Sequence, residues 1–250
     1  MTTRKLATLP AIAVALLLLD ASCTSPGTLH VYSLAAGSPT TLRDTGADTS
    51  SEVPSFIAPN ESLTGFAYDP FTDHFFLRLA PGNVIRVVDR PARAIKRKFR
   101  VGELSAGGGG NLTIRPRDGH VFALEPAARD VVEFTRFGEF VRRIKPEGLM
   151  AEPAGIAYDA ARDRLFLLTG GRPAQITTHS LDGGLRATVE PDREIAPGSL
   201  AYDSDKKEFY APLAKDAAIG VFGEDGRLHG MIHVLVTFVA VGPRSFLRMF

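Results

Sequence analysis

The chain repeats one pattern at a near-constant interval, and this repetition limits its possible folds more than any other feature. The copies are "GFAYDPFTDHFFLR" from Gly65, "NLTIRPRDGHVFAL" from Asn111, "GIAYDAARDRLFLL" from Gly155 and "SLAYDSDKKEFYAP" from Ser199. The tyrosine of "AYD", or its equivalent, falls at Tyr68, Ile114, Tyr158 and Tyr202, with spacings of 46, 44 and 44 residues. Repeats of this length are typical of solenoids and β-propellers.

Each repeat contains short apolar or alternating runs separated by turn residues. In the third copy the runs are 155–158, 164–168, 175–180 and 185–189, with Asp and Gly between them. Such runs indicate strands joined by turns, and four strands are the content of one propeller blade. A helical solenoid would need amphipathic segments of ten or more residues, and no repeat contains one. The pattern therefore predicts an all-β propeller.

The two ends of the repeated region are complementary. "TLHVYSLAAGSPTTLRD", residues 28–44, resembles the second half of a repeat, because "LHVYS" matches "IRVVD" at 85–89. "FVAVGPRSFLRMF", residues 238–250, resembles the first half, with "SFLRM" matching "FFLRL" at 75–79. A blade built from both termini closes the ring and removes exposed sheet edges.

We therefore predict one domain over residues 28–250 with about five four-stranded blades. Residues 45–62 fit either a long loop or a degenerate part of a blade. Six blades, or an incomplete ring completed by a partner, remain alternatives.

The N-terminus has the pattern of an export signal. Arg4 and Lys5 precede the uncharged segment 6–19, whose 14 residues would span about 21 Å as a helix. That length is short of the ~30 Å hydrocarbon core of a bilayer. Residues 1–22 are therefore expected to be a signal peptide that exports the protein from the bacterial cytoplasm.

Cys23 is the only cysteine, and it follows directly on this segment. "LLLLDASC" resembles the lipobox of bacterial lipoproteins at Ala21, Ser22 and Cys23, whereas Asp20 stands where leucine is expected. The resemblance implies that Cys23 is lipidated and anchors a periplasmic protein to the membrane. A plain secretory signal, giving a free periplasmic or secreted protein, is the alternative. With no second cysteine, no intramolecular disulfide can form.

The repeats resemble those of NHL- and YVTN-type β-propeller proteins over roughly residues 28–250. The resemblance is carried by "PAGIAYD" and "DRLF" in the third copy and by the Gly-containing turns at 138–141, 184–185 and 225–228. It implies the architecture and no particular activity, because propellers of this class include hydrolases, lactonases, lyases and binding scaffolds.

The aspartates of "YD" are candidates for metal ligands or for turn formation. Asp69, Asp159 and Asp203 each precede a predicted β-turn. An Asp side chain in this position accepts a hydrogen bond from the backbone N–H two residues on. We therefore expect these carboxylates to cap their own turns.

The histidines offer no metal motif. His74 and His120 hold equivalent repeat positions, and His229 and His233 lie in a segment with a strand pattern, where they would not share a helix face. No H-E-x-x-H motif, G-x-S-x-G motif or catalytic cysteine pattern occurs. The glycines 107–110 lack the G-K-[ST] of a phosphate loop, and we expect them to let the chain pass from one blade to the next. No cofactor is predicted.

"RAIKRKFR", residues 93–100, is the strongest charge cluster and falls on the predicted outermost strand of its blade. Cations on an edge strand discourage sheet-to-sheet aggregation. They are also suited to contact with anionic lipid head groups or an acidic partner. The net charge of +1 gives no reason to expect nucleic acid as a partner.

Functional surfaces of propellers are commonly built from the loops between strands two and three and between blades. Here these loops supply four candidate ligand-binding residues: Asn83, Arg129, Arg172 and Lys215. We expect a binding or scaffold protein without catalytic activity that recognises another protein or a small molecule, or serves as a component of an envelope assembly. The alternative is a metal-assisted hydrolase or lactonase whose central channel holds a divalent ion such as calcium through acidic and amide ligands.

Overall fold

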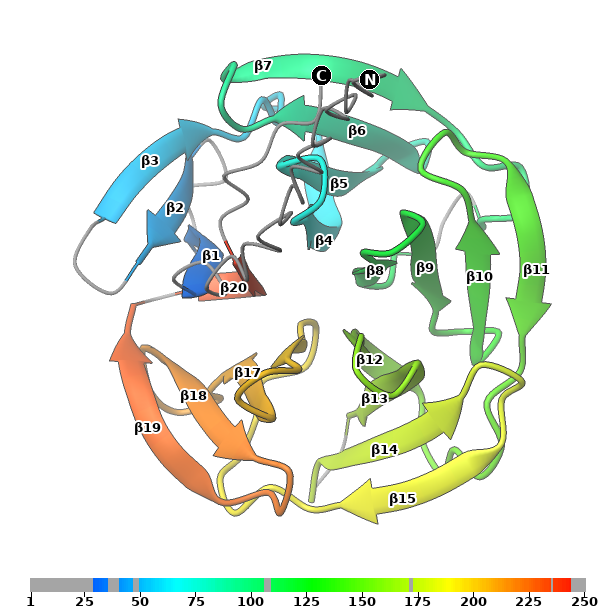
Figure 1. Ribbon diagram of the computed structural model, residues 1–250, viewed down its shortest axis with the longest axis vertical. Helices are drawn as coiled ribbons and strands as arrows, with labels where there is room; N and C mark the ends of the chain where they lie inside the picture. Colours follow the sequence, from blue (N-terminus) through cyan, green and yellow to red (C-terminus); the bar gives the residue numbers. More distant parts are fainter. Residues whose placement is uncertain are drawn as a thin grey trace, which may run out of the picture.

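A computed structural model describes residues 29–35, 41–46, 50–105, 109–170, 173–234 and 236–243. These residues form twenty strands in five antiparallel four-stranded sheets, arranged as blades around a central axis (Figure 1). The described residues contain no helix and therefore none that could cross a membrane. The predicted all-β, five-bladed propeller is confirmed, and the six-bladed and incomplete rings are wrong.

Four blades follow the sequence repeat, with the first strand of each nearest the axis. Blade one is β4 (Ser62–Asp69), β5 (His74–Ala80), β6 (Val84–Asp89) and β7 (Ala94–Phe99). Blade two is β8 (Leu112–Arg115), β9 (His120–Glu125), β10 (Asp130–Phe134) and β11 (Phe140–Ile144). Blade three is β12 (Pro153–Asp159), β13 (Arg164–Thr169), β14 (Gln175–Ser180) and β15 (Leu185–Val189). Blade four is β16 (Ala201–Asp203), β17 (Glu208–Pro212), β18 (Ala218–Gly223) and β19 (Leu228–His233).

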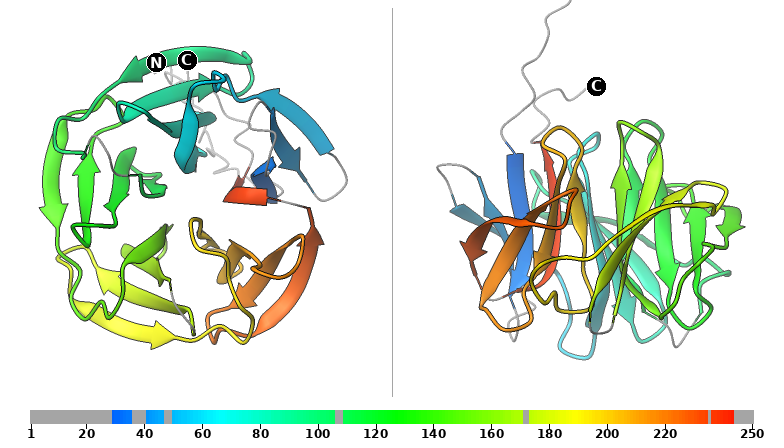
Figure 2. Two further views of the ribbon diagram at one scale, coloured as in Figure 1. Left: turned by 180° about the vertical axis from the view of Figure 1, so that it is seen from behind. Right: turned by 90° about the horizontal axis from the view of Figure 1, so that it is seen from below.

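The closing blade takes strands from both ends of the described chain, as predicted. Its order is β20 (Val236–Pro243), β1 (Leu29–Ala35), β2 (Thr41–Thr45) and β3 (Ser50–Pro54). β1 pairs with β20 from Leu29↔Pro243 to Ala35↔Val236. One face of the ring therefore carries both the start of β1 and the end of β20 (Figure 2).

The predicted division of this blade into two halves is wrong. "LHVYS" forms β1, the second strand of the blade and not the third, and β20 supplies the first strand alone. Second and third strands are both paired on two sides and buried on both faces, as β5 and β6 are. Their apolar patterns are therefore alike. Residues 45–62 contribute β3, the outermost strand, while "SFLRM" at 245–249 lies outside the described residues.

The hydrophobic core lies between neighbouring blades. Between the closing blade and blade one, the rings of Tyr32, Tyr68 and Phe75 pack with centroids 4.4–5.6 Å apart. The outermost strands are mostly exposed, and the basic segment 93–100 lies on β7 as predicted. Edge charge on β7 is thus compatible with its expected role against aggregation.

The inner strands are linked across the axis by a hydrogen-bonded pair that we call the crossbar, Asn111 and Ser199. Both occupy the first position of the repeat and both are buried. The Asn111 Oδ1 accepts from the backbone N–H groups of Phe66 (3.0 Å) and Leu112 (2.9 Å), and its Nδ2 donates to the Ser199 Oγ (3.4 Å). The Ser199 hydroxyl in turn donates to the carbonyl of Val239 (3.2 Å) and accepts from its N–H (3.0 Å).

Glycine is required where backbones approach one another near the crossbar. A Cβ on Gly65, which holds the crossbar position of blade one, would lie 2.6 Å from the Gly110 carbonyl oxygen. A Cβ on Gly110 would lie 2.2 Å from the Leu124 carbonyl oxygen. Gly109 and Gly110 thus carry the chain from the outer strand β7 to the inner strand β8, the role predicted for this glycine run.

Replacing Asn111 by Ala is expected to destabilise the propeller. The change leaves the buried N–H groups of Phe66 and Leu112 without the carboxamide oxygen, at a cost of about 2–4 kcal/mol in unfolding free energy. Urea denaturation followed by circular dichroism measures this loss. Asn60→Ala, at an exposed position, is the matched control. Equal stability of the two variants would show that the crossbar is not a structural element.

Candidate functional site

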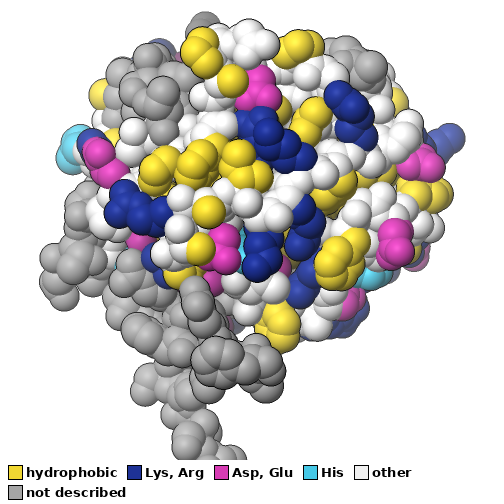
Figure 3. Space-filling model, turned by 90° about the horizontal axis from the view of Figure 1, so that it is seen from above, with side chains coloured by type: hydrophobic (Ala, Val, Ile, Leu, Met, Phe, Trp, Pro, Cys, Tyr) yellow, Lys and Arg dark blue, Asp and Glu magenta, His cyan; other side chains and the backbone are white. Residues whose placement is uncertain are grey.

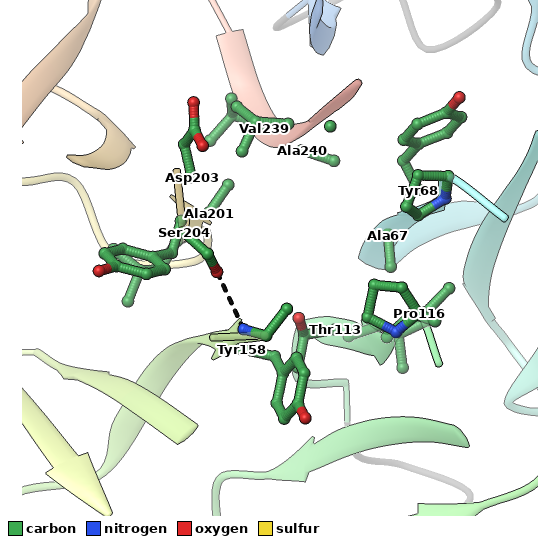
Figure 4. A pocket seen from close by; sticks show the side chains of 18 of the residues that line it. Ala67, Tyr68, Thr113, Pro116, Tyr158, Ala201, Asp203, Ser204, Val239 and Ala240 are labelled. Atoms are coloured by element: carbon green, nitrogen blue, oxygen red, sulfur yellow. Dashed lines mark hydrogen bonds between the residues drawn. The ribbon is translucent and has the colours of Figure 1, made fainter. Parts of the chain in front are cut away.

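A cavity of about 250 Å³ lies on the axis, enclosed by the inner strands of the ring (Figure 4). Its wall is mainly apolar and includes Phe66, Ala67, Leu112, Ile114, Leu200, Ala201, Val239 and Ala240. Strand β8 contributes Thr113 to this wall, and its side chain is partly exposed. Thr113 occupies the same repeat position as Ala67 in blade one and Ala201 in blade four. The repeat thus supplies small side chains around the axis.

The mouth of the cavity is formed by the residues that follow the inner strands. These are Pro70, Pro116, Ala160 and Ser204, each one place after "YD" or its equivalent. The Ser204 Oγ accepts a hydrogen bond from the Ala160 N–H at 2.9 Å and joins blades three and four at this point (Figure 4). The cavity therefore opens on the face made by the turns between first and second strands, which we call the mouth face.

Three tyrosines line the cavity, and their hydroxyl groups are held by carboxylates. Tyr68 donates to Asp73 at 3.0 Å and Tyr158 donates to Asp163 at 2.5 Å. Both aspartates have a positive φ of 57° and 55°, five residues after the tyrosine. The equivalent residue of blade four is Lys207. Tyr202 therefore donates instead to Glu224 of the β18–β19 turn, at 2.7 Å.

Burial controls the ionisation of these phenols. It raises the pKa of Tyr68, Tyr158 and Tyr202 above the ordinary value, and the hydrogen-bonded carboxylates add to the increase. Burial also raises the pKa of Tyr32 and Tyr210, the other two tyrosines of the chain. All five phenols are thus protonated at neutral pH, and Tyr68, Tyr158 and Tyr202 donate from their hydroxyl groups to carboxylates.

The aspartates of "YD" cap their own turns, as predicted. The backbone N–H groups of Phe71, Ala161 and Asp205 donate to Asp69 (3.0 Å), Asp159 (3.0 Å) and Asp203 (2.9 Å). Asp69 also lies 3.4 Å from Arg136 of blade two, which links neighbouring blades. These carboxylates serve the turns that shape the mouth.

The histidines also lie where the sequence places them. His74 begins β5 and His120 begins β9, and each faces a carboxylate, at 3.5 Å from Asp89 and 2.6 Å from Glu133. His229 and His233 lie on strand β19. Across the described ranges, no three His, Cys, Asp or Glu side chains gather into a group that could hold a metal ion.

The sequence-predicted ligand residues lie away from the cavity. Asn83 is buried, accepting from Arg78 Nε at 2.6 Å and donating to the Ser105 carbonyl at 2.9 Å. Arg129 is exposed in the β9–β10 turn, and the Lys215 ammonium lies 2.9 Å from Glu194. Arg172 and Cys23 lie outside the described residues.

Asn83, Arg129 and Lys215 belong to turns between second and third strands, at the end of each blade opposite the mouth face. None of the three lines the cavity. Their binding role stays a prediction.

Arg78 is a buried charge that the sequence reading did not single out. It lies in the middle of β5, and its guanidinium pairs with the Glu125 carboxylate of blade two and donates to the Leu124 carbonyl at 2.7 Å. Burial lowers the pKa of Arg78, and Glu125 limits the shift. A lone charge inside the apolar run "HFFLRLA" was the available signal, because a buried cation requires a partner.

The fold, but no family, is identified by comparison with known proteins. No protein-family model and no curated protein matches the chain. A chain of the nidogen/laminin complex superposes with a TM-score of 0.61 at 12% identity, covering 87% of this chain and 99% of that one. A protein of unknown function from Bacteroides caccae gives 0.53 at 13% identity, with 82% and 73% covered. Myxococcus xanthus glutaminyl cyclase gives 0.52 at 17% identity, with 74% and 72% covered. At these identities the likeness concerns the fold alone.

Because the five tyrosines are buried, we expect their phenols to ionise at a higher pH in the folded protein than in the unfolded chain. Because their folded-state pKa values lie above the unfolded value near 10, their contribution to stability is complete below about pH 10 and is lost as the pH rises further. Absorbance at 295 nm should stay flat to about pH 11 and then rise together with loss of the near-ultraviolet circular dichroism. In denaturant all five should titrate near pH 10. A phenolate signal at pH 10 from the folded protein would contradict their burial.

Proposed function

We propose that the protein binds a small apolar ligand in the central cavity and acts without catalysis. The observation that carries this proposal is the chemistry of the wall, in which apolar side chains from the inner strands surround the space and polar ones gather at the mouth. Ligand sites are commonly of this kind, largely apolar with a few polar groups that fix orientation. An apolar cavity of about 150 Å³ already admits benzene, so a ring or a short acyl chain suits this one.

A metal-assisted hydrolase would require several carboxylate or amide groups converging on one point. The carboxylates of the cavity lining are Asp203 and Asp205, which are neighbours in a single turn, and Asp203 accepts the Asp205 N–H. This arrangement suits a turn better than an ion, so the lining favours the binding function. The proposal includes no cofactor and no nucleic acid.

Export and anchoring are also part of the proposal. The signal-like segment 1–22 and the lipobox-like "LLLLDASC" support export from the bacterial cytoplasm and attachment to the membrane through a lipid on Cys23. A free periplasmic or secreted protein is the alternative. An anchored propeller would hold its ligand at the membrane surface. A protein partner that recognises the ligand-bound form would bind there.

Filling the cavity is expected to abolish ligand uptake. Thr113→Trp places an indole in the wall at a partly exposed position, and the chain has no other tryptophan. N-phenyl-1-naphthylamine, an uncharged apolar probe, should bind the native protein at one saturable site and bind the variant at least tenfold more weakly. Thr188→Trp, on the exposed strand β15, is the matched control and should bind as the native protein does. Equal binding by both variants would place the probe site elsewhere.

Lipidation of Cys23 is tested by the intact mass of the protein purified from bacterial membranes. The proposal predicts a chain beginning at residue 23 with the added mass of acyl chains, and Cys23→Ala should lose that mass and leave the membrane fraction. A mature chain that is cleaved near Ser22 and carries no lipid would contradict the membrane anchor. That result would not affect the proposed ligand binding in the cavity.

A further inference from the structure

The chain enters the propeller at the mouth face. Leu29 begins β1, pairs with Pro243 at the end of β20 and lines the cavity at its mouth. Cys23 is six residues upstream, and six residues span at most about 20 Å when fully extended. A lipid on Cys23, which belongs to the proposed function, would therefore hold the mouth face within about 20 Å of the bilayer surface.

The same face carries two exposed aromatic rings. Phe71 lies in the β4–β5 turn with 58% of its surface exposed, and Phe137 lies in the β10–β11 turn with 65% exposed. Turns between first and second strands and between third and fourth strands share one end of a blade, so both rings lie on the mouth face. Single exposed apolar side chains are common on protein surfaces, whereas exposed apolar groups that gather into one patch mark contact sites.

Arginines connect these two rings into one surface. The Arg97 guanidinium lies 4.8 Å from the centroid of Phe137, and that of Arg136 lies 5.4 Å from the centroid of Phe71. Arg97 also donates to the Arg136 carbonyl at 2.8 Å. We call these four residues the aromatic–arginine patch.

Strand β7, which supplies Arg97, runs from the mouth end of its blade to the opposite end and carries cations on the outer edge of the ring, the side on which Figure 3 shows many Lys and Arg side chains. In the part of the chain that the structure describes, no carboxylate lies within 4.0 Å of Arg93, Lys98 or Arg100. Arg93, in the β6–β7 turn on the mouth face, instead donates to the carbonyl oxygen of Glu52. Arg100 donates to the carbonyl oxygen of Gly82 in the β5–β6 turn, at the opposite end of the blade.

The neighbouring outer strand β11 differs in this respect. There Arg142 pairs with Glu133 at 2.6 Å and Arg143 pairs with Asp130 at 2.9 Å. The β7 cations are therefore in excess over local carboxylates, and an anionic surface would complement them.

We infer that the mouth face docks on an anionic phospholipid bilayer. Phe71 and Phe137 enter the boundary between head groups and acyl chains, and Arg97 and Arg136 remain at head-group level. Arg93 and Lys96, toward the mouth end of β7, contact lipid phosphates. Protection of a sheet edge explains the charges of β7 but not the two exposed rings. Docked in this way, the cavity opens toward the membrane, so its apolar ligand would be taken from the bilayer.

Vesicle binding tests this inference without the lipid anchor. The mature chain from residue 23, carrying Cys23→Ser, retains every described strand. It should sediment with vesicles of phosphatidylglycerol and phosphatidylethanolamine and not with phosphatidylcholine vesicles. Binding should fall steeply at 0.5 M salt, where the Debye length is about 4 Å.

Two sets of variants test the exposed phenylalanines and the cations of the β7 edge separately. Phe71→Ser with Phe137→Ser, and Arg93→Gln with Lys96→Gln, should each weaken vesicle binding at least tenfold with an unchanged thermal midpoint. Met150→Ser with Met231→Ser removes exposed apolar side chains outside the patch and should bind vesicles as the unsubstituted chain does.

Failure of the unsubstituted chain to bind phosphatidylglycerol vesicles, or full binding by the phenylalanine variant, would overturn the inference. Neither result bears on the lipid on Cys23 or on uptake of the naphthylamine probe. The proposed function is therefore judged separately.

Discussion

The approach of five inner strands to a common axis is the constraint on which the rest of this propeller depends. Where the strands begin, their backbones are so close that Gly65 and Gly110 leave no room for a Cβ. Asn111 and Ser199 occupy the remaining gap and satisfy buried backbone groups of blade one, blade two and the closing blade. Buried polar groups without such partners are costly, so the crossbar fixes how the blades meet.

The same repeat unit builds a closed region and an open one along the axis. Its first position supplies the glycines and the crossbar, and the residues that follow line the cavity with small side chains such as Ala67 and Thr113. The cavity opens at the turns that follow "YD". Asp69, Asp159 and Asp203 stabilise these turns by accepting hydrogen bonds from backbone N–H groups. A gradient from close packing to open space thus follows the order of residues within the repeat.

The sequence predicted what depends on local chemistry and missed what depends on which segments meet. The repeat identified the blades, and the position of each "YD" aspartate identified its turn cap. The division of the closing blade was missed, because β1 has the burial pattern common to second and third strands. The crossbar was also missed, since Asn111 stands in the most divergent copy and contacts Ser199 only once the ring has closed. The face on which the cavity opens was missed as well, and it lies opposite the loops that hold Asn83, Arg129 and Lys215. Which end of the axis is closed depends on contacts between different repeats, such as that of Asn111 with Ser199.

The pairing of β1 with β20 has a consequence for how the protein is made. β1 forms near the start of the chain, yet its inner edge stays unpaired until β20, the last described strand, has been synthesised. An unpaired strand edge is a template for intermolecular association, and non-local pairing of this kind is slow to form. If the chain is exported as proposed, this order would be favourable, because a ring that cannot close early is less of an obstacle to passage through a narrow translocation channel. Under the export that we propose, late closure would couple the completion of the fold to arrival outside the cytoplasm.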